Sequence, residues 1–283
     1  MSMPDHIGIE RLCCFGAMPP VEQVELAARM DCRFVGIGLT AMNYYNPDAW
    51  PEWSLRDLKL QREMSSVMRD TGVRPSLCEG FSIQPGVEAA AAVADLDLVA
   101  SLGCRCINLV SGERDKSRAI AQFSAVAELA QQRGILVTSE IGMPPLVTLD
   151  AGLRLIEQVG HPNFRLLLDT MHFFRMGSDP ADLAGHEAMI GYVQLADAPR
   201  ALGRLSYMEE ALHERLPPGA GELPLAELLP WLPADVVLGL EVPQRSLAAA
   251  GIGPDERVGQ AVRMSRSIIT AAVTPSDPRS GAR

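Results

Sequence analysis

Short apolar runs alternate along the chain with longer segments in which apolar residues recur at helical spacing. The runs are rich in Val, Ile and Leu, which is typical of strands buried on both faces of a parallel sheet. There are roughly eight of them, within HIGIERLCCF, CRFVGIGL, VRPSLCEGF, CRCINLV, ILVTSE, FRLLLD, IGYVQLAD and DVVLGLEV. The chain is therefore predicted to be a series of strand–helix units.

The helical segments carry start and stop signals of their own. Thr148 precedes one of them as a capping residue, and Gly160 follows it as a terminator. Ser178, Asp179 and Pro180 open a shorter helix, with a capping residue before a first-turn proline. The first of these helices is predicted over residues 148–159, and the others over residues 20–30, 57–70, 87–102, 117–132, 223–231 and 254–269.

Roughly eight strand–helix units in 283 residues predict a single (β/α)8 barrel, for which about 250 residues are typical. We place the barrel over residues 1–272 and predict that the polar tail, residues 273–283, is disordered. A doubly wound open sheet is the main alternative. That fold would be expected to carry a glycine-rich phosphate turn after an early strand, and the sequence contains none.

The composition supports a large core and excludes several classes of protein. Hydrophobic residues make up 47% of the chain, and the formal net charge of -10 argues against a nucleic-acid surface, which needs a basic stripe. No apolar stretch approaches the length of a membrane span, and the start of the chain leads us to expect no signal peptide. The six cysteines form no CxxC pair, which favours reduced thiols in a cytoplasmic protein.

Polar side chains stand at the ends of four consecutive predicted strands. Glu140, Asp169 and Glu241 each end an apolar run, and Gln194 has the corresponding place in the run between the last two. Each acid alone could equally form an ion pair or cap a helix. In a (β/α)8 barrel, however, the carboxyl ends of the strands meet at one mouth, where the chemistry takes place. Carboxylate and amide oxygens are hard ligands, so the spacing predicts a ring of ligands around one divalent cation.

The stretch LLLDTMHFFRMGSDPADL, in which His172 follows Asp169 by three residues, resembles the sixth-strand motif of the sugar phosphate isomerase/epimerase superfamily, the xylose isomerase-like TIM barrels. IGYVQLADAP and VVLGLEVP resemble the seventh and eighth strands of that family, and the resemblance covers essentially the whole chain. It implies a divalent metal held by Glu140, Asp169, Gln194 and Glu241, although many epimerases have His in place of Gln194. We expect Mn²⁺, with Mg²⁺, Co²⁺ or Zn²⁺ as alternatives.

The resemblance also implies roles for individual side chains. By analogy with the family's epimerases, Glu140 and Glu241 face each other across the substrate as paired acid and base. His172 would hydrogen-bond a substrate oxygen, and Arg215, in RLPPGAG, would neutralise a developing oxyanion. A histidine at a helix start and an exposed surface arginine are the structural alternatives for these two residues.

Two further polar residues belong to earlier strands. Glu79 ends the third apolar run, and Asn108 lies within the fourth. Either could bind substrate hydroxyls, and a structural role fits both equally well.

Three alternatives for the function follow. The first is a divalent-metal-dependent isomerase or epimerase of a sugar, keto-sugar or related polyhydroxy carbonyl compound, which transfers a proton through a metal-stabilised enediolate. The second is a metal-dependent lyase or dehydratase on the same scaffold, similar to a 3-dehydroshikimate dehydratase or to enzymes that eliminate from keto-glycosides or keto-inositols. The third is a non-catalytic barrel that binds the metal. In each case the partner is a small molecule, and the formation of a homo-oligomer is left open.

Overall fold

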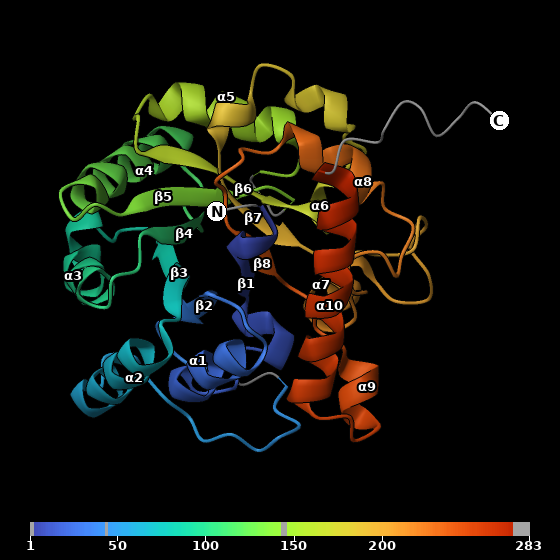
Figure 1. The fold of residues 1–283 in the computed structure, drawn as a ribbon. Helices are drawn as coiled ribbons and strands as arrows, with labels where there is room; N and C mark the ends of the chain where they lie inside the picture. Colours follow the sequence, from blue (N-terminus) through green and yellow to red (C-terminus); the bar gives the residue numbers. More distant parts are fainter. Residues whose placement is uncertain (1–2, 43–44, 143–145, 274–283) are drawn as a thin grey trace.

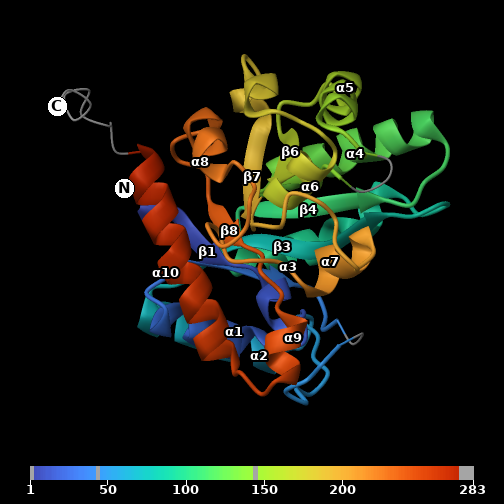
Figure 2. The ribbon, with the colours of Figure 1, turned by 90° about the vertical axis from the view of Figure 1, so that its right-hand side faces the viewer.

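The computed structural model describes residues 3–42, 45–142 and 146–273, and eight strands close into one parallel barrel. Each strand pairs with the next along the chain, and β8 pairs with β1 to complete the ring. The strands are β1 (Ile7–Ile9), β2 (Phe34–Gly38), β3 (Arg74–Ile83), β4 (Cys106–Ser111), β5 (Leu136–Glu140), β6 (Phe164–Asp169), β7 (Ile190–Leu195) and β8 (Leu238–Leu240). The predicted (β/α)8 barrel is confirmed, and its helices surround the strands in both views (Figures 1 and 2).

The helices begin where their capping residues predict. The Asp57 side chain accepts hydrogen bonds from the amides of Lys59 and Leu60, and Thr148 accepts one from Ala151. The helices are α1 (Pro20–Arg29), α2 (Leu58–Thr71), α3 (Val93–Ser101), α4 (Lys116–Gln131), α5 (Leu149–Val159), α6 (Thr170–Arg175), α7 (Tyr207–His213), α8 (Leu225–Leu228), α9 (Arg245–Ala249) and α10 (Pro254–Val273). The tail predicted to be disordered lies, beyond Val273, outside the described residues.

Two predicted strands differ from the observed ones. The first apolar run is a strand only over Ile7–Ile9, and it continues as a 3₁₀ helix over Arg11–Cys14. Glu79 does not end β3, because the strand continues to Ile83. The pairing of β3 with β4 is interrupted after Cys78 and then resumes, which the Glu-Gly sequence at this point does not indicate.

Three predicted helices are interrupted or of another type. The segment 87–102 begins as a 3₁₀ helix, Ala89–Ala92, because the Val93 amide bonds to the carbonyl of Ala90, three residues earlier. The segment 223–231 likewise contains α8 followed by the 3₁₀ helix Leu229–Trp231. The short helix that Asp179 caps is the 3₁₀ helix Pro180–Leu183.

A carboxyl group lies inside the barrel. Glu10 follows β1 and is fully buried, and the Tyr192 hydroxyl donates a hydrogen bond to it. Two glycines make this position available, since a Cβ at Gly36 or Gly239 would lie 1.9 Å from a Glu10 oxygen. Burial, and then the negative charge of Glu79, raises the pKa of Glu10 to about 8. Glu10 therefore keeps its proton at neutral pH.

We expect Glu10→Gln to make the free energy of unfolding less dependent on pH. The folded protein holds the Glu10 proton up to about pH 8, whereas the unfolded chain releases it near the ordinary pKa of 4.5. Between these values the unfolded state binds fewer protons, so stability falls as pH rises. Because an amide does not titrate, the variant should gain about 3 kcal/mol relative to wild type between pH 5 and pH 8. Urea unfolding across this range measures the difference, and parallel curves for the two proteins would contradict the expectation.

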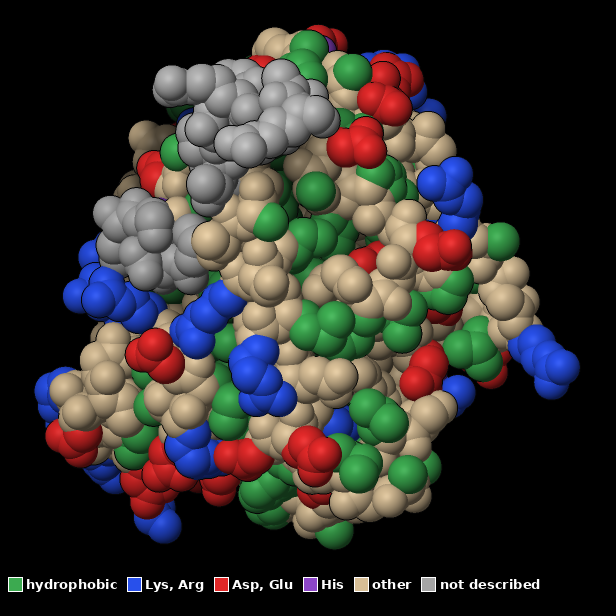
Figure 3. Space-filling view, turned by 45° about the vertical axis from the view of Figure 1, so that its right-hand side comes forward, with side chains coloured by type: hydrophobic (Ala, Val, Ile, Leu, Met, Phe, Trp, Pro, Cys, Tyr) green, Lys and Arg blue, Asp and Glu red, His purple; other side chains and the backbone are tan. Residues whose placement is uncertain are grey.

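The helices, the charged surface and the cysteines of the structure agree with what the composition predicts. Among the described helices, none combines the length and the apolar character that a membrane span requires. Acidic and basic side chains are interspersed over the face drawn in Figure 3. All six cysteines are buried and free, which agrees with the predicted reduced thiols. The cytoplasmic location stays a prediction.

Candidate active site

The eight polar residues predicted from the sequence are linked by one chain of contacts, although Glu79 and Asn108 lie within β3 and β4 and not at their ends. Its first part joins β4, β5 and α6. Asn108 Nδ2 donates to Glu140 Oε2 at 3.4 Å, and His172 Nε2 lies 3.3 Å from Glu140 Oε1. Asp169 caps α6 by accepting a hydrogen bond from the His172 amide at 2.9 Å. The cap places the imidazole beside Glu140.

Arg215 joins Asp169 to Glu241. Its Nη1 pairs with Asp169 Oδ2 and lies 3.0 Å from Glu241 Oε2, while its Nε donates to the Ala211 carbonyl at 2.7 Å. The side chains of all three charged residues are at most 5% exposed. Because an unpaired charge at such depth is strongly unfavourable, the arginine and the two carboxylates depend on one another.

Gln194 connects Glu241 to β3. Its Nε2 donates to Glu241 Oε1 at 2.9 Å and lies 3.5 Å from Glu79 Oε1. Glu79 Oε2 lies in turn 3.8 Å from Nε of Arg11, a buried residue that the sequence analysis missed. A signal for it existed, since Glu10 and Arg11 directly follow an apolar run, as the predicted acids do.

The surroundings of the carboxyl groups shift their pKa values in opposite directions: the pKa of Asp169 is lowered and that of Glu241 is raised. Burial alone would raise the pKa of Asp169, but the positive charges of Arg215 and His172 hold it at about 2. Burial raises the pKa of Glu241 well above its ordinary value, although Arg215 lowers it. For His172, burial lowers the pKa, but the carboxylates of Asp169 and Glu140 raise it more. Asp169 is therefore a permanent anion, whereas Glu241 takes up a proton far more readily than an exposed glutamate.

These residues surround a cavity of about 120 Å³. Its polar lining consists of Glu79, Glu140, His172, Arg215 and Glu241. Its apolar lining consists of Leu12, Met42, Met208, Ala211 and Leu212. Asp169 and Gln194 are fully buried and do not line it. The sequence analysis missed the apolar lining, because α7, which supplies three of its members, was not predicted.

Three residues of the site could hold a metal ion. Glu140, Asp169 and His172 each offer one ligand atom, and these atoms lie within 4.8 Å of one another. Carboxylates and an imidazole suit a divalent cation. Gln194 Oε1 is a further candidate ligand, because it is buried and has no hydrogen-bond partner among the described residues. The donor set therefore fits a divalent metal.

The arrangement differs from the predicted ligand set in two respects. His172, predicted to bind substrate, belongs to the tight group, whereas Glu241 does not, and Nη1 of Arg215 contacts the carboxylates of both Asp169 and Glu241. A cation shared by Asp169 and Glu241 would therefore compete with the guanidinium for both carboxylates.

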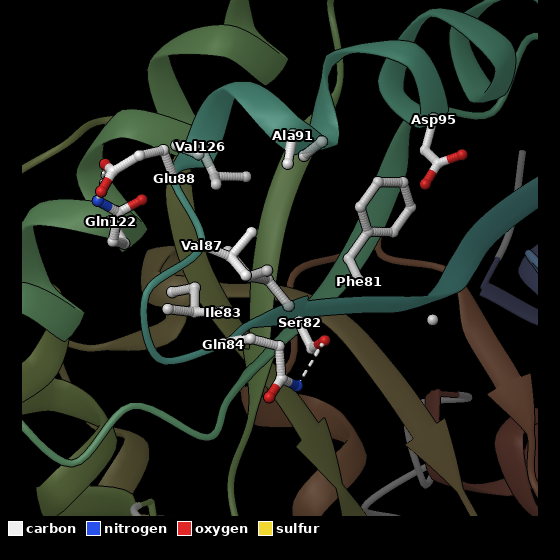
Figure 4. Close-up of a pocket in the computed structure, with 14 residues that line it drawn as sticks. Phe81, Ser82, Ile83, Gln84, Val87, Glu88, Ala91, Asp95, Gln122 and Val126 are labelled. Atoms are coloured by element: carbon white, nitrogen blue, oxygen red, sulfur yellow. Dashed lines mark hydrogen bonds between the residues drawn. The ribbon is translucent and has the colours of Figure 1, made fainter.

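A second cavity, of about 180 Å³, lies between the end of β3, the start of α3 and the middle of α4 (Figure 4). Its polar side chains have partners: Gln84 donates to Ser82 at 3.0 Å, Gln122 donates to Glu88 at 2.9 Å, and Asp95 pairs with Arg56. None of the eight predicted residues lines it. The candidate site is therefore at the mouth of the barrel.

A closed parallel barrel with acids gathered at its mouth is an architecture that many enzymes share. The family model described as the xylose isomerase-like TIM barrel matches residues 24–268, and the chain belongs to this family. The chain is 35% identical over 112 residues to 2-epi-5-epi-valiolone 7-phosphate 2-epimerase from Actinoplanes sp., a match that spans 37% of this chain and 40% of that protein.

Solved structures share the fold at low sequence identity. The crystal structure of the IOLI protein with a binding zinc atom has a TM-score of 0.76 at 15% identity, over 97% of this chain and 100% of that one. D-psicose 3-epimerase with D-tagatose, from Clostridium cellulolyticum H10, has a TM-score of 0.70 at 14% identity, over 95% and 99% of the two chains.

Proposed function

We propose that the protein is a divalent-metal-dependent isomerase or epimerase of a sugar, keto-sugar or related polyhydroxy carbonyl compound. The observation that carries this proposal is the lining of one cavity by Glu140 and Glu241 together with Arg215 and His172. Two carboxyl groups and two cationic or hydrogen-bonding groups are what proton transfer next to a carbonyl requires. The family and the partial similarity to an epimerase support the same conclusion.

Each side chain has a distinct task in this proposal. Glu140 and Glu241 act as acid and base: one removes the proton from the carbon beside the carbonyl, and the other returns a proton. The raised pKa of Glu241 suits a group that must accept a proton and give it up again. Arg215 lies where it can neutralise negative charge that develops on the substrate oxygen. Return of the proton to the opposite face inverts the centre, and return to the neighbouring carbon isomerises an aldose to a ketose.

The metal would be held by Glu140, Asp169, Gln194 and Glu241, with His172 either as a further ligand or as a donor to a substrate oxygen. When bound, it would polarise the carbonyl oxygen as a Lewis acid. Mn²⁺ is our first choice, because a ligand set made mainly of carboxylate and amide oxygens suits it. Glu79 and Asn108 complete the site as candidates for binding substrate hydroxyls.

Elimination on the same scaffold is the second candidate. It needs one base and one acid that protonates a departing hydroxyl, and His172 Nε2, 3.3 Å from Glu140, could supply that acid. Gln194, at a place where many epimerases have His, leaves this choice open.

Incubation with polyhydroxy ketones and aldoses in deuterated water separates the two reactions. We expect the protein to place deuterium on the carbon beside the carbonyl, observed by NMR, without loss of water. The absorbance of a conjugated enone would favour elimination instead. If no ketone or aldose of a broad panel exchanged, with Mn²⁺ present, the proposal of proton transfer would be wrong.

A further inference from the structure

Helix α7 is firmly fixed beside the cavity. Glu210 receives two hydrogen bonds from Arg175 of α6, at 2.7 and 2.9 Å, and both side chains are less than a tenth exposed. At its start, Ser206 and Glu209 form a reciprocal capping box. α6 directly follows Asp169, so α7 is tied to an element of the site.

Two residues of α7, Tyr207 and Ala211, contact side chains of the candidate site. Tyr207 and Ala211 are four residues apart and therefore share a face of the helix. The Tyr207 hydroxyl contacts His172 Nδ1 and lies 3.3 Å from the Gly142 carbonyl, and the Ala211 carbonyl accepts the hydrogen bond from Arg215. His172 also packs directly on Gly142, where a Cβ would lie 2.3 Å from the His172 Cβ.

We propose that Tyr207 is a positioning residue of the proton-transfer site. Its hydroxyl is the hydrogen-bond partner of His172 Nδ1, so that Nε2 is the ring nitrogen that faces Glu140. A histidine whose second nitrogen is engaged keeps one ring orientation, and loss of such an outer partner typically lowers activity by about 10–100-fold. Without the hydroxyl, the ring is free to turn and to present either nitrogen to the cavity. The kinetic part of this inference rests on the proposed function, whereas the structural part does not.

The test is Tyr207→Phe, which keeps the aromatic ring beside His172 and removes only the hydroxyl. In the ¹⁵N spectrum of histidine-labelled protein, with the His172 signals assigned by their loss in His172→Gln, we expect the Nδ1 signal to move. With the ketone that exchanges fastest in deuterated water, we expect kcat to fall about 10–100-fold while KM stays nearly unchanged. Glu209→Ala is the matched control, because it removes the capping-box carboxylate and weakens the start of α7 but leaves the Tyr207 hydroxyl in place; it should alter neither readout.

Three results would overturn the proposal. Unchanged His172 signals in Tyr207→Phe would show that the Tyr207 hydroxyl does not contact the ring. An unchanged kcat would show that the contact does not position His172 for turnover. An equal loss in Glu209→Ala would also contradict it, since the effect would then come from the stability of α7. If the protein turned over no ketone, the proposed function would fail, while the ring spectra would still decide whether Tyr207 fixes His172.

Discussion

Glu140→Gln is expected to lower kcat by about 10²–10⁴-fold, the contribution typical of a general acid or base. The amide keeps the size of the carboxylate and remains able to contact Asn108 and His172, but it can neither accept nor return a proton. The measurement is turnover of the exchanging ketone at saturating Mn²⁺, with thermal unfolding to show that the variant is folded. Glu227→Gln, an exposed position on α8, is the control and should keep wild-type turnover.

Comparison with Glu241→Gln makes this experiment sharper. If the two glutamates serve opposite faces of the substrate, each variant should lose proton exchange from one epimer and keep part of the exchange from the other. Equal loss of exchange from both epimers in both variants would indicate one shared role, such as metal binding. Wild-type turnover in Glu140→Gln would contradict the acid–base assignment.

Removal of the metal is expected to abolish turnover. The predicted chemistry needs a cation that stabilises negative charge on the substrate oxygen, a contribution of several kcal/mol that the side chains alone do not replace. Activity after dialysis against a chelator, and after return of Mn²⁺, Mg²⁺ or Co²⁺, measures this dependence. Full activity of protein shown by elemental analysis to be metal-free would contradict it.

A variant of Gln194 tests the ligand set within the same experiment. Gln194→Ala should lower Mn²⁺ affinity about tenfold or more, because it removes a buried amide whose oxygen has no other partner among the described residues. Gln131→Ala, at an exposed position on α4, is the matched control. Unchanged Mn²⁺ affinity in Gln194→Ala would remove Gln194 from the metal site.

The sequence was sufficient to predict the barrel because each parallel strand is covered on both faces and is therefore mostly apolar. The same geometry explains why Glu140, Asp169, Gln194 and Glu241 could be found, since carboxyl ends of parallel strands meet at one mouth. Local exceptions could not be predicted. The passage of β3 beyond Glu79 depends on pairing with β4, and no local pattern records where a neighbouring strand ends.

The contacts made by loops were also beyond prediction. Tyr207 and Met208 belong to α7, which is far in sequence from His172. The connection that follows β7 and leads to Arg215 carries α7 to the cavity, and no local sequence pattern indicates that course. Arg11 is different, because it follows a short apolar run directly. It was missed because the run was interpreted as one strand through Phe15, whereas the chain leaves the strand at Ile9.

Crystals grown with Mn²⁺, and measured for its anomalous scattering, test the central claim most directly. The account predicts one strong peak at the mouth of the barrel, within coordinating distance of the carboxylates of Glu140 and Asp169. A bound Mn²⁺ elsewhere, or no peak at a concentration that supports turnover, would contradict it.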